Sequence, residues 1–225
     1  MQIICVGQTT YDITFFSNSY PLENTKIRNH EKVEGPGGCA FNMASLLNKW
    51  GSDVKLISIV GNDMYGNEII RAIQNDNLDQ SYLQKGDGHT TLSTILCNLS
   101  NHTRTIITHQ DSDLSLMPTT LDVTPDLIIG DGRHPEIFET ILKTYPEALS
   151  MIDAGRFDED TIRLGKLVKY LVCSKDFAEA YTNLKMDLTD QNNIIEVFTK
   201  LANDFPGQIV ITLEKAGSIV KVDHN

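Results

Sequence analysis

The chain has few cysteines, and none of them form a metal-binding or redox pair. Its 225 residues include four, at Cys5, Cys39, Cys97 and Cys173, with no Cys-x-x-Cys motif. We therefore expect no zinc site, redox dithiol or disulfide scaffold. Cys5 and Cys173 lie in apolar runs, which favours buried free thiols. The six histidines show no spacing typical of a metal site.

Long hydrophobic runs and an excess of basic charge are also missing. No apolar stretch is long enough to cross a bilayer, and no basic segment followed by an apolar run resembles a signal peptide. We therefore expect a cytoplasmic protein. The 19 Lys and Arg residues against 30 Asp and Glu residues give a formal net charge of −11, which disfavours a nucleic acid or an anionic membrane as the main partner. A small anionic ligand is still compatible with this charge, because a helix N-terminus can bind one.

Glycine and proline are concentrated in residues 35–38, which predicts a turn and disfavours the interior of a helix or strand. Apolar residues then recur at helical spacing over residues 40–50, and Gly51 is placed to end that helix. Such a turn lets a ligand approach the backbone at a helix N-terminus, and Asn42 can both donate and accept hydrogen bonds there. On these residues alone, a structural corner and a ligand site are equally well supported.

The N-terminal region combines one apolar run with a long polar and aromatic segment. Residues 2–7 predict a buried strand, and Asp12 follows it as either a turn residue or a ligand contact. Residues 9–36 contain no core-like run, so they predict a flap over the core, with an exposed strand over residues 25–33 as one option.

Residues 89–109 form a second segment, which has the pattern of a β-hairpin. Its two β-like runs, 92–99 and 104–109, are separated by a short turn and predict a hairpin. Arg104 is the basic residue of this hairpin, and at an exposed strand position an arginine is more often solvated than bound to a ligand.

The remaining sequence alternates short apolar runs with helical patterns. Strands are predicted over residues 54–60, 127–129, 149–152, 170–173 and 209–213, with a helix after each of the first four. Residues 81–83 are a further, short strand candidate. Asp63, Ser174 and Asp190 are placed to cap three of the helices. This alternation predicts one α/β domain with a mostly parallel sheet and helices on both faces, in which ligands bind beyond the carboxyl ends of the strands.

Four motifs, in this order, resemble those of the ribokinase-like (PfkB) carbohydrate kinases, and the likeness covers nearly the whole chain. They are Cys5-Val6-Gly7 with Asp12, Gly37-Gly38 with Asn42, the Gly-x-Asp-x-x-Gly at Gly61, Asp63 and Gly66, and residues 211–218. Residues 132–133, 153–156 and 174–178 look most like the ketohexokinase-like branch. The resemblance implies a three-layer α/β fold over residues 1–225 with a β-lid formed by segments of about 9–36 and 89–109.

By this resemblance, the protein is an ATP-dependent kinase that phosphorylates a hydroxyl of a small sugar, with Mg²⁺ as a second cofactor. The resemblance implies that Asp12, Gly37, Gly38 and Asn42 contact sugar hydroxyls, and that Arg104 reaches from the lid toward substrate or phosphate. It also implies a homodimer contact through the lid. The residues that it assigns to the ATP site are Ser174, Thr212, Glu214 and Gly217.

The chain departs from the family pattern at two places. The family's Asn-x-x-Glu, which helps to organise magnesium, falls at Ser174 and Phe177, so no magnesium ligand is assigned. The family's Gly-Ala-Gly-Asp, which supplies an anion hole and the catalytic base, would lie beyond Asn225. We therefore expect a chain that is incomplete at its C-terminus, carries no catalytic base and has no useful kinase activity by itself. Two alternatives are a nucleoside kinase of the same fold and a non-catalytic fragment that binds sugar or dimerises.

Overall fold

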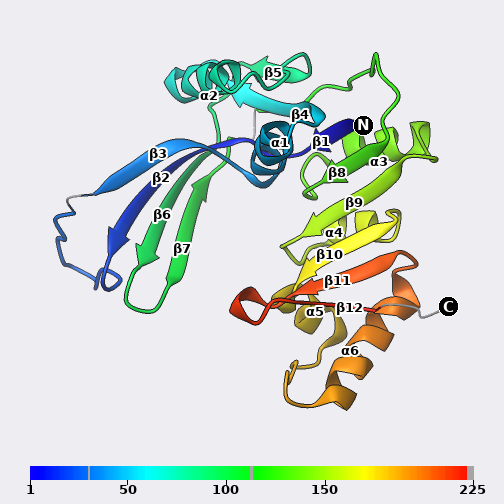
Figure 1. Cartoon of the computed structure of the whole chain (residues 1–225). Coiled ribbons are helices and arrows are strands. Elements are labelled where there is room, and N and C mark those ends of the chain that lie inside the picture. The colour runs from blue at the N-terminus through cyan, green and yellow to red at the C-terminus, as the bar shows by residue number, and fades with distance from the viewer. Residues whose placement is uncertain (30, 112–113, 222–225) are drawn as a thin grey trace. The chain divides into compact units, whose positions relative to one another are not determined.

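The computed structural model describes residues 1–29, 31–111 and 114–221 (Figure 1). It has a mixed α/β fold in which most strands are parallel and helices flank the sheet, as predicted. The chain divides into two compact units. We call Gln8–Gly51 with Lys55–Met117 the lid unit, and Met1–Gly7 with Ser52–Val54 and Pro118–Asn225 the βα unit.

The βα unit is built on six strands in the order β12-β11-β10-β9-β8-β1. The neighbours from β1 to β11 pair in parallel, and β12 pairs with β11 antiparallel. The parallel strands are β1 (Gln2–Val6), β8 (Leu127–Gly130), β9 (Leu149–Ala154), β10 (Tyr170–Ser174) and β11 (Gln208–Thr212), and β12 is Ser218–Val220. The helices are α3 (Pro135–Thr144), α4 (Glu159–Gly165), α5 (Lys175–Thr182) and α6 (Gln191–Asp204), with a 3₁₀ turn at Glu214–Ala216.

Side-chain caps explain where three of these helices begin. Asp158 accepts a hydrogen bond from the backbone N–H of Thr161, Ser174 from Phe177 and Asp190 from Asn192, with donor–acceptor distances of 2.8–3.1 Å. Each bond satisfies one of the N–H groups that a helix start leaves without a helical partner. The predicted caps at Ser174 and Asp190 are thus confirmed.

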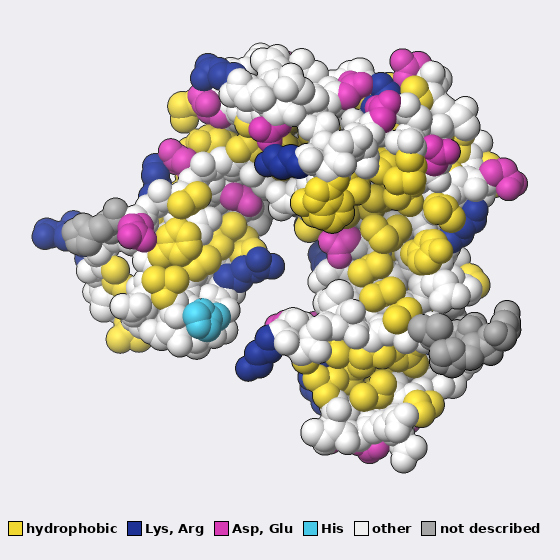
Figure 2. All heavy atoms as spheres, viewed as in Figure 1, with side chains coloured by type: hydrophobic (Ala, Val, Ile, Leu, Met, Phe, Trp, Pro, Cys, Tyr) yellow, Lys and Arg dark blue, Asp and Glu magenta, His cyan; other side chains and the backbone are white. Residues whose placement is uncertain are grey.

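Apolar burial follows the predicted strands. The side chains of Cys5 and Cys173 are buried, and burial raises the pKa of each thiol to about 12. Figure 2 shows hydrophobic side chains gathered over the region of α6 and β12, where Ile195 and Val220 are about half exposed. In the part of the chain that the structure describes, no helix is both long and apolar enough to cross a membrane.

The lid unit contains two small sets of strands and two helices. Strands β4 (Asp53–Gly61) and β5 (Leu83–Gly86) pair in parallel, and a separate sheet has the order β3-β2-β6-β7. The bounds of that sheet, which we call the lid sheet, are β2 (Thr10–Ser17), β3 (Lys32–Gly37), β6 (Leu92–Asn98) and β7 (Thr103–His109). The helices are α1 (Cys39–Lys49) and α2 (Met64–Asn75).

Three expectations for the lid unit are wrong in detail. Residues 10–17 form a regular strand, which their aromatic and polar composition did not predict. Residues 35–37 are not a turn but the end of β3, because β3 is an edge strand and proline is tolerated at an edge. The strand predicted at 81–83 instead begins at Leu83. The predicted hairpin of β6 and β7 is confirmed.

Candidate functional site

Asp12 lies on β2 with its carboxylate held against a glycine of the neighbouring strand. The hydroxyl of Thr10 donates to Oδ1 of Asp12 at 2.6 Å. A Cβ atom built on Gly37 would lie 2.0 Å from Oδ2 of Asp12, whereas one built on Gly35 would meet no atom within 4 Å. Position 37 must therefore be glycine for the Asp12 carboxylate to occupy this place, and the two predicted site residues are adjacent.

Gly38 connects this strand to the start of α1. Its φ of +92° favours glycine, and an added Cβ would lie 2.4 Å from the carbonyl oxygen of Gln8. Gly38 is the N-cap of α1, and no side chain makes a cap hydrogen bond there. Asn42 is exposed in the first turn and donates its backbone N–H to the carbonyl of Gly38 at 2.9 Å. The predicted residues Asp12, Gly37, Gly38 and Asn42 thus lie along one strand–helix connection and the strand beside it.

Arg104 shares a sheet face with Asp12 but is not next to it. In the register of the lid sheet, Asp12 lies opposite Ser93, and Arg104 lies opposite Cys97, which is four residues farther along. Strand spacings of about 3.3 Å per residue and 4.8 Å between strands separate the Cα atoms of Asp12 and Arg104 by roughly 16 Å. The described structure therefore does not bring Arg104 to the Asp12 carboxylate.

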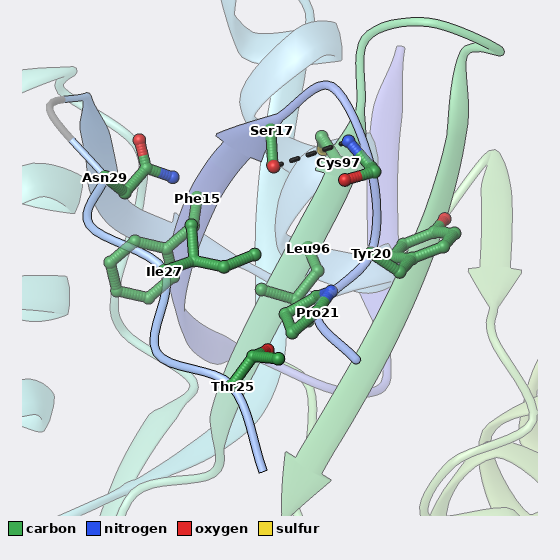
Figure 3. Close-up of a pocket in the computed structure, with 10 residues that line it drawn as sticks. Phe15, Ser17, Tyr20, Pro21, Thr25, Ile27, Asn29, Leu96 and Cys97 are labelled. Atoms are coloured by element: carbon green, nitrogen blue, oxygen red, sulfur yellow. Dashed lines mark hydrogen bonds between the residues drawn. The ribbon is translucent and has the colours of Figure 1, made fainter. Parts of the chain in front are cut away.

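The lid unit also contains a cavity of about 370 Å³ between the lid sheet and the loop that follows β2 (Figure 3). Phe15 and Leu96 line it from the sheet, and Tyr20, Pro21 and Ile27 line it from the loop. Side chains alternate between the two faces of a strand, so Phe15 points to the face opposite that of Asp12. This cavity is therefore separate from the Asp12 carboxylate and Gly37.

In the βα unit, a cavity of about 560 Å³ lies beside the ends of β10 and β11. Three of the four residues assigned to ATP line it, namely Ser174, Thr212 and Glu214. Gly217 does not line this cavity, but its φ of +94° lets it end the 3₁₀ turn that forms one wall. The hydroxyl of Thr212 donates to the carbonyl of Cys173 at 3.3 Å, which ties the two strand ends together.

Three lysines that the sequence analysis did not single out also line this cavity, namely Lys175, Lys185 and Lys215. Lys175 and Lys185 place their Nζ atoms 3.6 and 2.7 Å from the two carboxylate oxygens of Glu179. The hydrogen bond from Lys185, together with one from the N–H of Met186, holds the pKa of Glu179 below its ordinary value. Lys175 and Glu179 are four residues apart on α5, so the sequence carried a signal for one pair. Lys185 is brought in by the loop after α5.

Phe177, at the position to which the resemblance assigns the Glu of the family's Asn-x-x-Glu, lies in a cluster of aromatic rings. Phe177 is 1% exposed, and its ring contacts those of Phe157, Tyr181 and Phe205 at centroid distances of 5.8–6.3 Å. Ser174 Oγ is engaged in the α5 cap. Among the residues that the structure describes, no group of three His, Cys, Asp or Glu side chains could hold a metal ion.

Residues 1–137 match the family described as pfkB family carbohydrate kinase. A 5-dehydro-2-deoxygluconokinase of Mesomycoplasma hyopneumoniae strain 7448 is 27% identical over 126 residues, which cover 56% of this chain and 36% of that protein. The chain thus spans about a third of the length of the curated relatives that it matches.

Solved structures share the fold over the whole chain. A putative ribokinase from Agrobacterium tumefaciens superposes with a TM-score of 0.82 at 21% identity, covering 100% of this chain and 74% of that one. An Arabidopsis thaliana ribokinase complexed with ribose and ATP gives a TM-score of 0.74 at 16% identity, covering 99% of this chain and 74% of that one. The structures show the shared fold, and the family match covers more than half of the residues: the chain belongs to the pfkB family of carbohydrate kinases.

Proposed function

We propose that this chain carries the sugar- and ATP-binding groups of an ATP-dependent kinase that phosphorylates a hydroxyl of a small sugar. The observation that carries the proposal is the Asp12 carboxylate, which Thr10 orients and for which Gly37 leaves room. An ionised carboxylate offers about four acceptor positions, and Thr10 uses one. Asp12 can therefore accept hydrogen bonds from neighbouring sugar hydroxyls, while Asn42 supplies a further donor and acceptor on α1.

The substrate class follows from the same chemistry. A site that hydrogen-bonds hydroxyl groups discriminates strongly against ligands that lack them, because its polar groups would then be left unpaired. The relatives support a small polyhydroxylated compound as the substrate. One relative is named for 5-dehydro-2-deoxygluconate, and another is complexed with ribose. We accordingly propose a sugar or a sugar acid as the phosphoryl acceptor.

The cavity beside β10 and β11 fits a nucleotide. When bound there, ATP would supply the phosphoryl group. Ser174 and Thr212 offer hydroxyls, and Lys175 and Lys185 offer cationic groups that complement phosphate oxygens. Glu214 would accept hydrogen bonds at the same wall, and Gly217 would shape it. Magnesium does not fit at position 177, because the Phe177 side chain is buried and provides no oxygen ligand.

We also propose a homodimer contact through the lid sheet. Val33 of β3 and Ile106 of β7 are 60% and 47% exposed, and by the strand register both lie on the face of the lid sheet that carries Asp12. Light scattering during size-exclusion chromatography tests this contact. A dimer that an Ile106→Lys variant converts to monomer supports it, and a wild-type monomer would rule it out.

The kinase proposal is tested by measuring ADP release from ATP in the presence of ribose, fructose, 5-dehydro-2-deoxygluconate or adenosine. Calorimetric titration of the same compounds separates binding from turnover. Sugar-dependent ADP release that disappears in an Asp12→Ala variant supports a sugar kinase. Turnover of adenosine alone would instead favour a nucleoside kinase. Sugar binding without turnover would favour a non-catalytic chain, and binding of none of these compounds would refute the proposal.

A further inference from the structure

The Gly-x-Asp-x-x-Gly motif forms a tight hydrogen-bonded turn at the start of α2. Asp63 is the N-cap of this helix, and its Oδ1 accepts from the backbone N–H of Gly66 at 2.8 Å. A Cβ atom on Gly66 would lie 2.1 Å from the carbonyl oxygen of Gly61. One on Gly61 would lie 2.4 Å from the backbone nitrogen of Thr90. Both positions must therefore be glycine, because a Cβ atom would collide with neighbouring backbone atoms. One of the atoms that a Cβ of Gly61 would meet belongs to Thr90, which lies outside the motif.

Thr90 closes a compact set of hydrogen bonds with this turn. Its backbone N–H donates to Oδ2 of Asp63 at 2.8 Å, and its hydroxyl donates to Oδ1 at 2.7 Å. The same hydroxyl accepts from the backbone N–H of Gly61 at 2.9 Å. Thr90 is 1% exposed, so these bonds are shielded from water, and breaking one leaves a buried polar group unpaired. Asp63 thus does more than cap α2, because it also fixes a residue 27 positions later in the chain.

Thr90 lies just before β6, the strand that pairs with β2, and β2 carries Asp12. The carbonyl of Thr91 accepts a hydrogen bond from the backbone N–H of Tyr11 at 2.8 Å, and β6 then begins at Leu92. Asp12 directly follows Tyr11 and lies opposite Ser93 in the parallel register. The ring of Tyr11 also packs on that of Tyr65, which belongs to the same turn, at a centroid distance of 4.8 Å.

From this continuous path we propose that Asp63 is a positioning residue. Together with Thr90, it fixes the N-terminal ends of β2 and β6 and thereby holds the Asp12 carboxylate in place. The path has two parallel branches, one through the Thr90–Thr91 backbone and one through the Tyr65–Tyr11 ring contact. Only the identification of Asp12 as a sugar-binding group rests on the proposed function. The anchoring itself does not.

The anchoring is tested by hydrogen–deuterium exchange on the full chain with an Asp63→Asn variant. Asparagine is as good an N-cap as aspartate, so α2 keeps its cap. However, the amide nitrogen that replaces Oδ2 would face the N–H of Thr90, donor against donor. We expect exchange to become about tenfold faster in peptides covering residues 9–12 and 90–93, in line with the loss of one buried hydrogen bond. The matched control is Asp190→Asn, which changes the N-cap of α6 in the same way.

A second pair of variants separates anchoring from a general loss of stability. Thr90→Ser keeps the hydroxyl and should exchange like the wild type, whereas Thr90→Val removes it at nearly equal volume and should behave like Asp63→Asn. The proposal is overturned if Asp63→Asn leaves exchange in these two segments unchanged, or raises it equally throughout the chain. It is also overturned if Thr90→Ser and Thr90→Val give the same exchange rates.

The link to ligand binding is tested by calorimetric titration with ribose, fructose and 5-dehydro-2-deoxygluconate. For the sugar that the wild type binds, we expect Asp63→Asn to raise Kd about fivefold while Kd for ATP stays unchanged. Unchanged sugar affinity with faster exchange would show that the anchor does not position Asp12, and would refute that role. If the wild type binds none of these sugars, the proposed function fails, whereas the exchange comparison still decides whether Asp63 anchors the two strands.

Discussion

Asp12 in the lid unit and Ser174 in the βα unit are both predicted from the sequence as ligand-binding residues, yet their side chains are engaged differently. Thr10 orients the Asp12 carboxylate, and Gly37 leaves space for it. The Ser174 hydroxyl instead caps α5. In the βα unit, the cationic side chains of Lys175 and Lys185 line the cavity beside β10 and β11, and both pair with Glu179. The candidate residue of the lid unit is thus held by two neighbours on a sheet, whereas that of the βα unit belongs to a helix start beside a cavity lined by charged side chains.

The largest expected effect is that of a substitution at Phe177 in the βα unit. The family pattern would place a metal-organising residue at this position, whereas Phe177 is a buried aromatic side chain. We expect Phe177→Ala to lower the free energy of unfolding by about 3–5 kcal/mol, as for other buried aromatic side chains. Chemical denaturation measures this loss, and Ser174→Ala serves as a cap-only control at about 1 kcal/mol. A Phe177→Ala variant with wild-type stability would contradict the core role of this ring.

Asp12 should dominate sugar recognition in the lid unit. We expect Asp12→Ala to raise Kd for the bound sugar about 10- to 100-fold, because hydrogen bonds to charged groups contribute about 1.5–3 kcal/mol each. Calorimetry with ATP on the same variant is the control, and Kd for ATP should not change. An equal loss of both affinities would show that Asp12 supports the fold and does not contact the sugar.

The cavity lysines should have a smaller effect, and only on nucleotide affinity. We expect Lys175→Met and Lys185→Met each to raise Kd for ATP about two- to fivefold, since exposed ion pairs contribute about 0.2–1 kcal/mol. Lys200→Met on α6, whose side chain pairs with Glu196 away from this cavity, is the matched control. No change for either cavity variant would remove these lysines from the proposed ATP site.

The smallest effect concerns acid stability, where the two units should behave alike. Burial pushes the pKa of Asp63 up, but the hydrogen bonds from Gly66 and Thr90 outweigh it and hold the pKa below the usual 3.8. The same balance, with Thr161 as donor, lowers the pKa of Asp158 in the βα unit. A depressed pKa adds stability that is fully present above the unfolded-state pKa and is lost as pH falls through the folded-state value.

We therefore expect the stability difference between the wild type and Asp63→Asn to shrink on going from about pH 5 to about pH 3, and likewise for Asp158→Asn. Denaturant titrations across this range provide the measurement. A difference that stays constant with pH for either variant would show that the charge of that carboxylate is not what stabilises its helix start.

The sequence was most informative where local chemistry decides the structure. Helix caps at Asp63, Ser174 and Asp190 follow from side chains that satisfy neighbouring N–H groups, and the parallel strands follow from short apolar runs. Strand β2 escaped prediction because it lies in a four-stranded lid sheet and not in the central core, so its side chains are only partly buried. Because of Pro36, a turn was predicted where β3 ends. Only the tertiary arrangement shows that β3 is an edge strand.

The same distinction between local and tertiary information applies to the candidate site. Motif order identified Asp12 and the glycines, but the contact between Gly37 and the Asp12 carboxylate depends on the pairing of β2 with β3, which the sequence does not reveal. The role of Lys185 likewise depends on how the loop after α5 folds back on Glu179. Arg104 was predicted to reach toward substrate or phosphate, which stays a prediction; the lid register separates it from Asp12 by four residues along the strand.

The central claim, that Gly37 leaves room for a sugar-binding carboxylate, is tested most directly by comparing Gly37→Ala with Gly35→Ala. Neither glycine has a positive φ, and only the methyl group at position 37 would collide with Asp12. Calorimetric titration with the bound sugar should show Kd raised roughly tenfold or more for Gly37→Ala and little changed for Gly35→Ala. Equal sugar affinities for the two variants would contradict the claim.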